Sequence, residues 1–111
     1  MAEKPLLWLG SARRDLRAFP DDARQEAGYQ LSRVQHGEEP VDWKPLPSVG
    51  LGVMEIRIRT TVAHRVIYVA KFPEAVYVLH AFEKRARKIG AVDLAAAKKR
   101  WNDLLRQRRD L

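Results

Sequence analysis

The sequence contains no cysteine, which excludes a disulfide framework, a zinc site with thiolate ligands and a cysteine nucleophile. Long hydrophobic runs are also missing. The longest apolar run near the start, Leu6 to Leu9, is much shorter than the apolar region of a signal peptide or a membrane-spanning helix. We therefore expect a cytoplasmic protein that neither crosses nor binds a membrane.

The sequence also lacks the motifs of metal, nucleotide and hydrolase chemistry. It has no glycine-rich phosphate loop, and His36, His64 and His80 do not fall at the spacing of metal ligands. None of its serines lies in the context of a nucleophile elbow. We therefore expect no metal site and no small-molecule cofactor.

Acidic residues are scarce in the last quarter of the chain. Residues 1–83 contain eleven Lys/Arg and eleven Asp/Glu, whereas residues 84–111 contain ten Lys/Arg and three Asp. The formal net charge of +7 therefore arises in the last quarter. A localised positive excess indicates a polyanionic partner, with nucleic acid ahead of an anionic membrane surface. A solvated helix rich in Lys and Arg is the structural alternative.

The 111 residues fit one domain spanning 1–111. Apolar spacing predicts a helical hairpin from Ser11 to His36, interrupted at Pro20, after a short edge strand at Leu6 to Leu9. Residues 37–52 contain three prolines and three glycines, and they predict a loop. A basic amphipathic helix is predicted from Asp93 to Arg109.

Three β-branched runs between the loop and the last helix predict an antiparallel meander: Val53–Arg59, His64–Phe72 and Ala75–Lys84. We predict an α+β fold in which the N-terminal helical hairpin and the C-terminal helix pack on one face of an antiparallel sheet of three to four strands. The other face can then remain open to solvent. Residues expected to pack inward are Met54, Ile56, Ile58, Val66, Tyr68, Tyr77 and Leu79.

The same alternation gathers cations, one imidazole and one aromatic ring on the open face: Arg57, Arg59, Arg65, Lys71, His80, Phe82 and Lys84. Cations bind phosphates, and an exposed ring stacks on an unpaired base. Metal-free RNA cleavage needs two proton transfers and stabilisation of the charged phosphorane. His80 or Lys84 could transfer the protons, while Arg57 and Arg65 stabilise the charge. Alternatively, the charges are merely solvated and Phe82 belongs to the core.

Four segments in order resemble the phage-related HigB-like toxins of the RelE/ParE superfamily: Lys44–Leu46, Leu51–Arg57, His64–Tyr68 and Tyr77–Arg85. The resemblance implies a RelE-like fold and the toxin of a type II toxin–antitoxin module. Most members of this family are mRNA interferases, endoribonucleases that cleave mRNA on the ribosome and so inhibit translation. The implied partners are mRNA, the ribosome and a cognate helix-turn-helix antitoxin.

The resemblance also indicates the site residues. The expected catalytic set is Arg57, Arg65, His80, Lys84 and Arg85. RNA contacts are expected from Lys44, Arg59, Lys71, Phe82, Arg87 and Lys88. The sequence departs from the family pattern at His64, at Arg85 and over residues 87–90. An arginine at position 85 keeps the charge of the lysine it replaces, but it holds its proton too tightly to act as a general acid.

Two other functions fit the same sequence. One is a ParE-like toxin with the same fold, which inhibits gyrase and cleaves no RNA. The other is a non-catalytic module that binds RNA or the ribosome through its basic surface.

Overall fold

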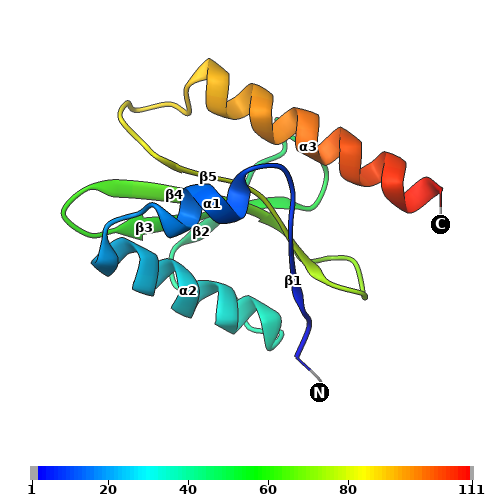
Figure 1. Ribbon diagram of the computed structural model, residues 1–111, viewed down its shortest axis with the longest axis horizontal. Coiled ribbons are helices and arrows are strands. Elements are labelled where there is room, and N and C mark those ends of the chain that lie inside the picture. Colours follow the sequence, from blue (N-terminus) through cyan, green and yellow to red (C-terminus); the bar gives the residue numbers. More distant parts are fainter. Residues whose placement is uncertain (1–2, 111) are drawn as a thin grey trace.

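The computed structural model describes residues 3–110. Its elements are β1 (Leu6–Trp8), α1 (Ala12–Arg17), α2 (Asp21–Gln35), β2 (Trp43–Pro45), β3 (Val53–Arg59), β4 (Ala63–Val69), β5 (Val76–Glu83) and α3 (Ala91–Arg109). The strands form one sheet in the order β1-β5-β4-β3-β2 (Figure 1). Within residues 3–110, no helix has a stretch that is both long and apolar enough to cross a membrane.

The sheet has five strands of mixed direction, not the predicted three to four antiparallel strands. β1 pairs in parallel with β5, where Leu6 lies opposite Val76. β2 lies inside the predicted loop and pairs antiparallel with β3, where Lys44 lies opposite Glu55. β1 matches the edge strand predicted at Leu6 to Leu9, whereas β2 was not predicted because its three residues are too few to show a clear alternation.

The helices cover both faces of the sheet, so the prediction that they share one face is wrong. α1 and α2 pack against one face, whereas α3 packs against the other (Figure 1). The reason lies in the central strands, which are apolar on both sides. In β4, Val66 and Tyr68 pack toward α1 and α2, whereas Ile67 and Val69 pack toward α3. A strand that is apolar on both sides must be covered on both sides.

A β-bulge changes the alternation in β5. Ile67 lies opposite His80 and Tyr68 lies opposite Val78, so Leu79 has no partner on β4. The extra residue places both Leu79 and His80 on the side of α3. Tyr77 and Leu79 were therefore assigned to the wrong face, because alternation was extended through a position where it stops.

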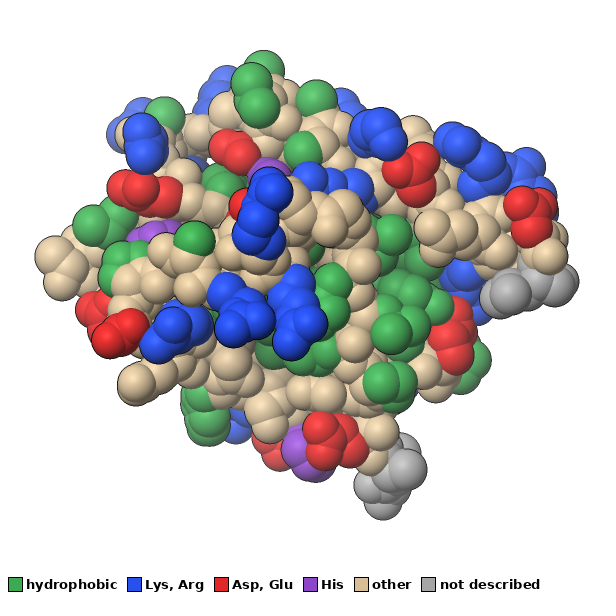
Figure 2. Space-filling model, in the orientation of Figure 1, with side chains coloured by type: hydrophobic (Ala, Val, Ile, Leu, Met, Phe, Trp, Pro, Cys, Tyr) green, Lys and Arg blue, Asp and Glu red, His purple; other side chains and the backbone are tan. Residues whose placement is uncertain are grey.

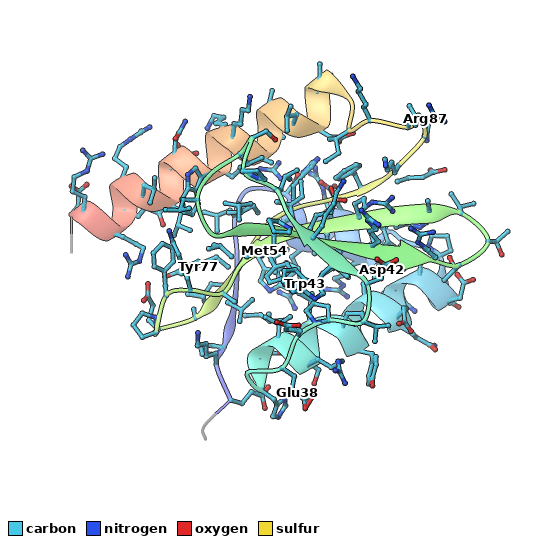
Figure 3. The ribbon with its side chains drawn as sticks, turned by 180° about the vertical axis from the view of Figure 1, so that it is seen from behind. Glu38, Asp42, Trp43, Met54, Tyr77 and Arg87 are labelled. Atoms are coloured by element: carbon cyan, nitrogen blue, oxygen red, sulfur yellow. The ribbon has the colours of Figure 1, made fainter. Side chains whose placement is uncertain are left out.

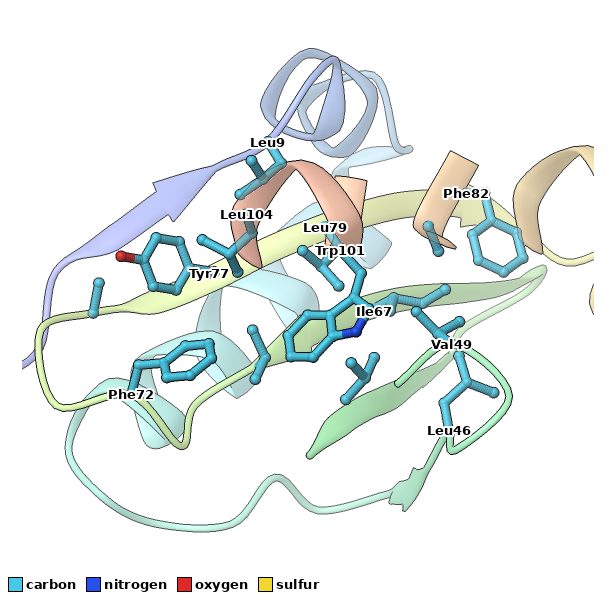
Figure 4. Close-up of a cluster of buried hydrophobic side chains, with 14 residues drawn as sticks. Leu9, Leu46, Val49, Ile67, Phe72, Tyr77, Leu79, Phe82, Trp101 and Leu104 are labelled. Carbon is cyan, nitrogen blue, oxygen red and sulfur yellow. The ribbon is translucent and has the colours of Figure 1, made fainter. Parts of the chain in front are cut away.

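α3 is anchored by an indole. Trp101 is 7% exposed and lies in a cluster with Ala97, Leu104 and Leu79 (Figure 4). Its ring stacks on Phe72, with 6.2 Å between the ring centroids and an interplanar angle of 16°. A side chain at position 50 would collide with the indole, so this close approach requires Gly50.

The C-terminal end of α3 is held by an ion pair. Arg108 donates two hydrogen bonds to the Glu74 carboxylate, at 2.7 and 3.1 Å. The Tyr77 hydroxyl donates a third bond to Glu74, at 2.7 Å. These bonds, first that from Arg108, lower the pKa of Glu74 from 4.5 to about 2.

Replacing Trp101 with alanine is expected to lower the free energy of unfolding by about 3–5 kcal/mol, because a large cavity would remain between α3 and the sheet. Chemical denaturation measures this loss. Leu105→Ala, at a 38% exposed position of the same helix, is the control and should cost much less. Equal losses in the two variants would contradict the role given to the indole.

The lowered pKa of Glu74 predicts that part of the free energy of unfolding is lost at acidic pH. Because the pKa of Glu74 is lowered in the folded state, its contribution is complete above pH 4.5 and disappears as the pH falls through about 2. Over that range, the unfolding free energy of the wild type should therefore fall more than that of Glu74→Gln. Denaturation from pH 2 to 5 tests this, with Glu38→Gln as the control for losing an exposed carboxylate. Parallel pH curves for wild type and Glu74→Gln would disprove it.

Candidate nucleic-acid interface

Charged side chains occupy the part of the α3-facing side of the sheet near the turn between β3 and β4. Arg57 of β3 and Arg65 of β4 lie directly opposite one another. Arg65 also lies opposite Phe82 of β5. Pairing between β2 and β3 adds Lys44 and Glu55. The sheet therefore brings together side chains from positions 44 to 84, which we call the cationic cluster: Lys44, Arg57, Arg65 and Lys84.

Glu55 lies at the centre of the cationic cluster and is 1% exposed. Its Oε1 atom is 3.4 Å from Arg65 Nε, 3.7 Å from Arg57 Nε and 3.8 Å from Lys44 Nζ. None of these contacts is a hydrogen bond. Within the described residues, both Glu55 oxygens and the Nε atoms of Arg57 and Arg65 lack a hydrogen-bond partner. Buried polar groups are normally paired, so this group of four unpaired atoms requires an explanation.

Burial also changes the acid–base properties of the cluster. Burial is the largest cause of the lowered pKa of Arg65, whereas the negative charge of the nearby Glu55 carboxylate acts to raise that pKa. Burial, followed by the charge of Arg65, also lowers the pKa of Lys84. The Lys84 ammonium is therefore a stronger acid than that of an unperturbed lysine. In the cationic cluster, the lysines can donate a proton, whereas the arginines remain charged and can only stabilise anions.

A cleft of about 290 Å³ lies beside the cationic cluster. It is lined by Lys44, Leu46, Ser48, Glu55, Lys84, Arg87, Lys88, Ile89 and Leu94. The segment between β5 and α3 provides the basic residues 84, 87 and 88. In the view from behind, Arg87 lies at the opposite end of the molecule from Tyr77 (Figure 3). The α3-facing side of the sheet thus has an apolar end, near Tyr77, and a basic end.

The structure gathers six of the predicted residues around this cleft: Lys44, Arg57, Arg65, Lys84, Arg87 and Lys88. Arg59 lies two residues beyond Arg57 at the end of β3, and its Nε is 2.8 Å from the Asp42 carboxylate. Arg85 is exposed and contacts Glu83. Lys71 lies elsewhere, because its Nζ donates to the Leu51 carbonyl and lies over the Trp101 ring.

His80 and Phe82 are held in the packing between β5 and α3. His80 is 7% exposed, and its Nε2 is 2.8 Å from the Asp93 carboxylate. Arg100 Nη1 is 2.9 Å from His80 Nδ1. Because arginine only donates, Nδ1 must accept and Nε2 must carry the proton. Both ring nitrogens are therefore engaged. Phe82 is 8% exposed and stacks on His80, so its ring is not presented to a base.

Glu55, at the centre of the cationic cluster, was given no role from the sequence. Two signals were present: Glu55 belongs to the segment Leu51–Arg57 that resembles the family pattern, and it lies two residues before Arg57, on the same face of β3. The hydrogen bonds of His80 to Asp93 and Arg100 had no sequence signal, because they depend on where α3 packs.

The fold and the cleft define an α+β domain with a cationic surface beside a cleft. A model of the phage-derived Gp49-like proteins matches residues 14–102, and the chain belongs to this family. The family belongs to the RelE/HigB-type toxin superfamily and is a toxin family of toxin–antitoxin systems. The observed architecture is consistent with the RelE-like fold. A search of curated proteins finds no significant match.

The cleft predicts a change in the salt dependence of RNA binding. Each lost phosphate contact should reduce the slope of log K against log salt by about 0.7 for a single strand. Lys84→Gln and Arg87→Gln should each show this reduction in titrations of single-stranded RNA at several salt concentrations. Lys71→Gln, which removes an equal charge away from the cleft, is the control and should leave the slope unchanged. An equal effect of all three substitutions would contradict the assignment of the surface.

Proposed function

We propose that this chain is the toxin of a type II toxin–antitoxin module and cleaves mRNA on the ribosome. The observation that carries the proposal is the set of buried arginine donors without partners in the cationic cluster, next to a cleft lined by Lys84. Charged donors in a partly dry site favour a phosphate that gains negative charge in the transition state. Gyrase inhibition and simple RNA binding, the two alternatives, do not need such donors.

In the proposed reaction, the 2′-oxygen of one nucleotide attacks the adjacent phosphorus atom and the bond to the 5′-oxygen breaks. Arg57 and Arg65 hold the phosphate and stabilise the charged phosphorane. Lys84 gives its proton to the leaving 5′-oxygen. The products are a 2′,3′-cyclic phosphate and a 5′-hydroxyl. The proton of the 2′-hydroxyl passes to a base of the protein, and with Lys84 and the two arginines in their roles the reaction needs no metal ion.

The ribosome would be held by basic residues outside the cleft. Lys and Arg side chains gather over α1 and α2 and along the outer side of α3 (Figure 2). Those exposed on α1 and α3 are Arg13, Arg14, Arg17, Lys98, Lys99, Arg106 and Arg109. Such surfaces bind nucleic acid through phosphates without reading its sequence. In this proposal the protein acts in the cytoplasm, and a helix-turn-helix antitoxin neutralises it.

Lys84 provides the test of this function. In a purified translation system, the wild-type chain should cut mRNA, and Lys84→Ala should reduce the cleavage rate by about 100-fold or more. Lys84→Arg should keep RNA binding but not cleavage, because arginine retains the charge and holds its proton too tightly. Mapping the 5′ ends of the mRNA fragments measures cleavage, and Lys71→Ala serves as the control.

Different results would select the alternatives. Intact mRNA together with inhibited DNA supercoiling would identify a gyrase inhibitor. Intact mRNA together with salt-sensitive RNA binding would identify a non-catalytic RNA-binding module. Full cleavage by both Lys84 variants would retain the function and disprove the assignment of the general acid.

A further inference from the structure

We propose that Glu55 accepts the proton of the attacking 2′-hydroxyl, and that Lys44 and Arg57, which cover its carboxylate, move away from it only when a phosphate binds. This inference rests on the proposed function and completes it, because the reaction needs a proton acceptor and the structure engages both ring nitrogens of His80, the acceptor that the sequence suggested. Among the described residues that line the cleft, Glu55 has the only carboxylate.

Other acceptors are occupied or remote. His80 uses both ring nitrogens, on Asp93 and Arg100. His64 faces the opposite side of the sheet, where its ring lies 4.3 Å from that of Phe19. His36 follows the end of α2 and is bonded to the Ser32 carbonyl. Asp42 does not line the cleft, and its carboxylate is 2.8 Å from Arg59 and 3.6 Å from Arg57. Glu55 is therefore the carboxylate that lines the cleft, and both its oxygens lack hydrogen-bond partners.

The missing hydrogen bonds indicate a site that awaits a ligand. A buried carboxylate is costly unless its oxygens accept hydrogen bonds. Three cations surround Glu55 at 3.4–3.8 Å, close enough to offset its charge, yet none donates a hydrogen bond to it. Its lone pairs and the Nε–H groups of Arg57 and Arg65 are all unused. An RNA backbone offers the complementary groups, namely a hydroxyl that donates and a phosphate that accepts.

The cover over Glu55 consists of side chains that can move. The Lys44 side chain is 47% exposed and that of Arg57 is 27% exposed, whereas that of Arg65 is 8% exposed and donates a hydrogen bond to the His64 carbonyl. A phosphate competes with Glu55 for these cations and forms charge-assisted hydrogen bonds with them. Drawing Lys44 and Arg57 toward the phosphate opens the carboxylate to the cleft. The base is then exposed only beside a bound phosphodiester.

Each proton that moves in this reaction has a donor and an acceptor. The 2′-hydroxyl proton passes to a Glu55 oxygen as the 2′-oxygen forms its bond to phosphorus. The bond from phosphorus to the 5′-oxygen breaks, and that oxygen receives a proton from Lys84. Afterwards Glu55 loses its proton and Lys84 regains one from solvent. A DNA strand has no 2′-hydroxyl and cannot enter this reaction, which makes RNA the substrate class.

Glu55→Gln tests the assignment, because glutamine has the same shape and cannot take the proton. We expect its mRNA cleavage in the translation system to fall by about 100-fold or more. Binding of an uncleavable 2′-O-methyl copy of the cut fragment should be kept or strengthened, since one negative charge is removed. Glu83→Gln, an exposed neighbour on β5, is the control and should cleave like the wild type.

Chemical rescue separates catalysis from packing. Glu55→Ala leaves space beneath the cationic cluster, and added formate should restore part of its cleavage but none in Lys84→Ala. Thermal denaturation of each variant establishes that it is folded. Cleavage by Glu55→Gln within about threefold of the wild type would overturn the Glu55 proposal and leave the proposed function intact. Failure of the wild type to cleave mRNA would overturn both.

Discussion

The position of α3 on the sheet decides how much of one face is left for charged residues. Trp101 fills the centre of that contact, and Arg108 holds the end of the helix through Glu74. Nearer the other end, His80 joins β5 to Asp93 and Arg100. With the helix fixed there, apolar residues occupy one part of the face. The other part, next to the turn between β3 and β4, holds the cationic cluster.

The bulge in β5 connects this packing to the site. If the alternation continued without the bulge, Tyr77 and Leu79 would lie on one side of the sheet, and His80 and Phe82 would lie on the other. The extra residue instead turns His80 toward α3, where two polar side chains bind it, and places Phe82 beneath its ring. A histidine that seemed free for catalysis thus becomes part of the scaffold. The proposed mechanism therefore assigns proton transfer to Lys84 and Glu55.

The cationic cluster combines burial with incomplete pairing. Three positive side chains surround one carboxylate and Lys84 lines the same cleft, so positive charge is in excess there. Part of the conformational stability is given up to keep donors and acceptors unpaired. Natural proteins accept such local costs mainly at functional sites. The same reasoning favours a phosphate-binding role over a purely structural one.

Local sequence determined much of this protein. Periodicity set the two N-terminal helices, the last helix and the three central strands to within a few residues, because each is long enough to show its repeat. It also placed Glu55, Arg57 and Arg65 on the same side of the sheet. Tertiary structure alone decided the rest. The pairing of β1 and β2, the bulge at Leu79, the second covered face and the hydrogen bonds of His80 all depend on residues far apart in the chain. No local pattern records such contacts.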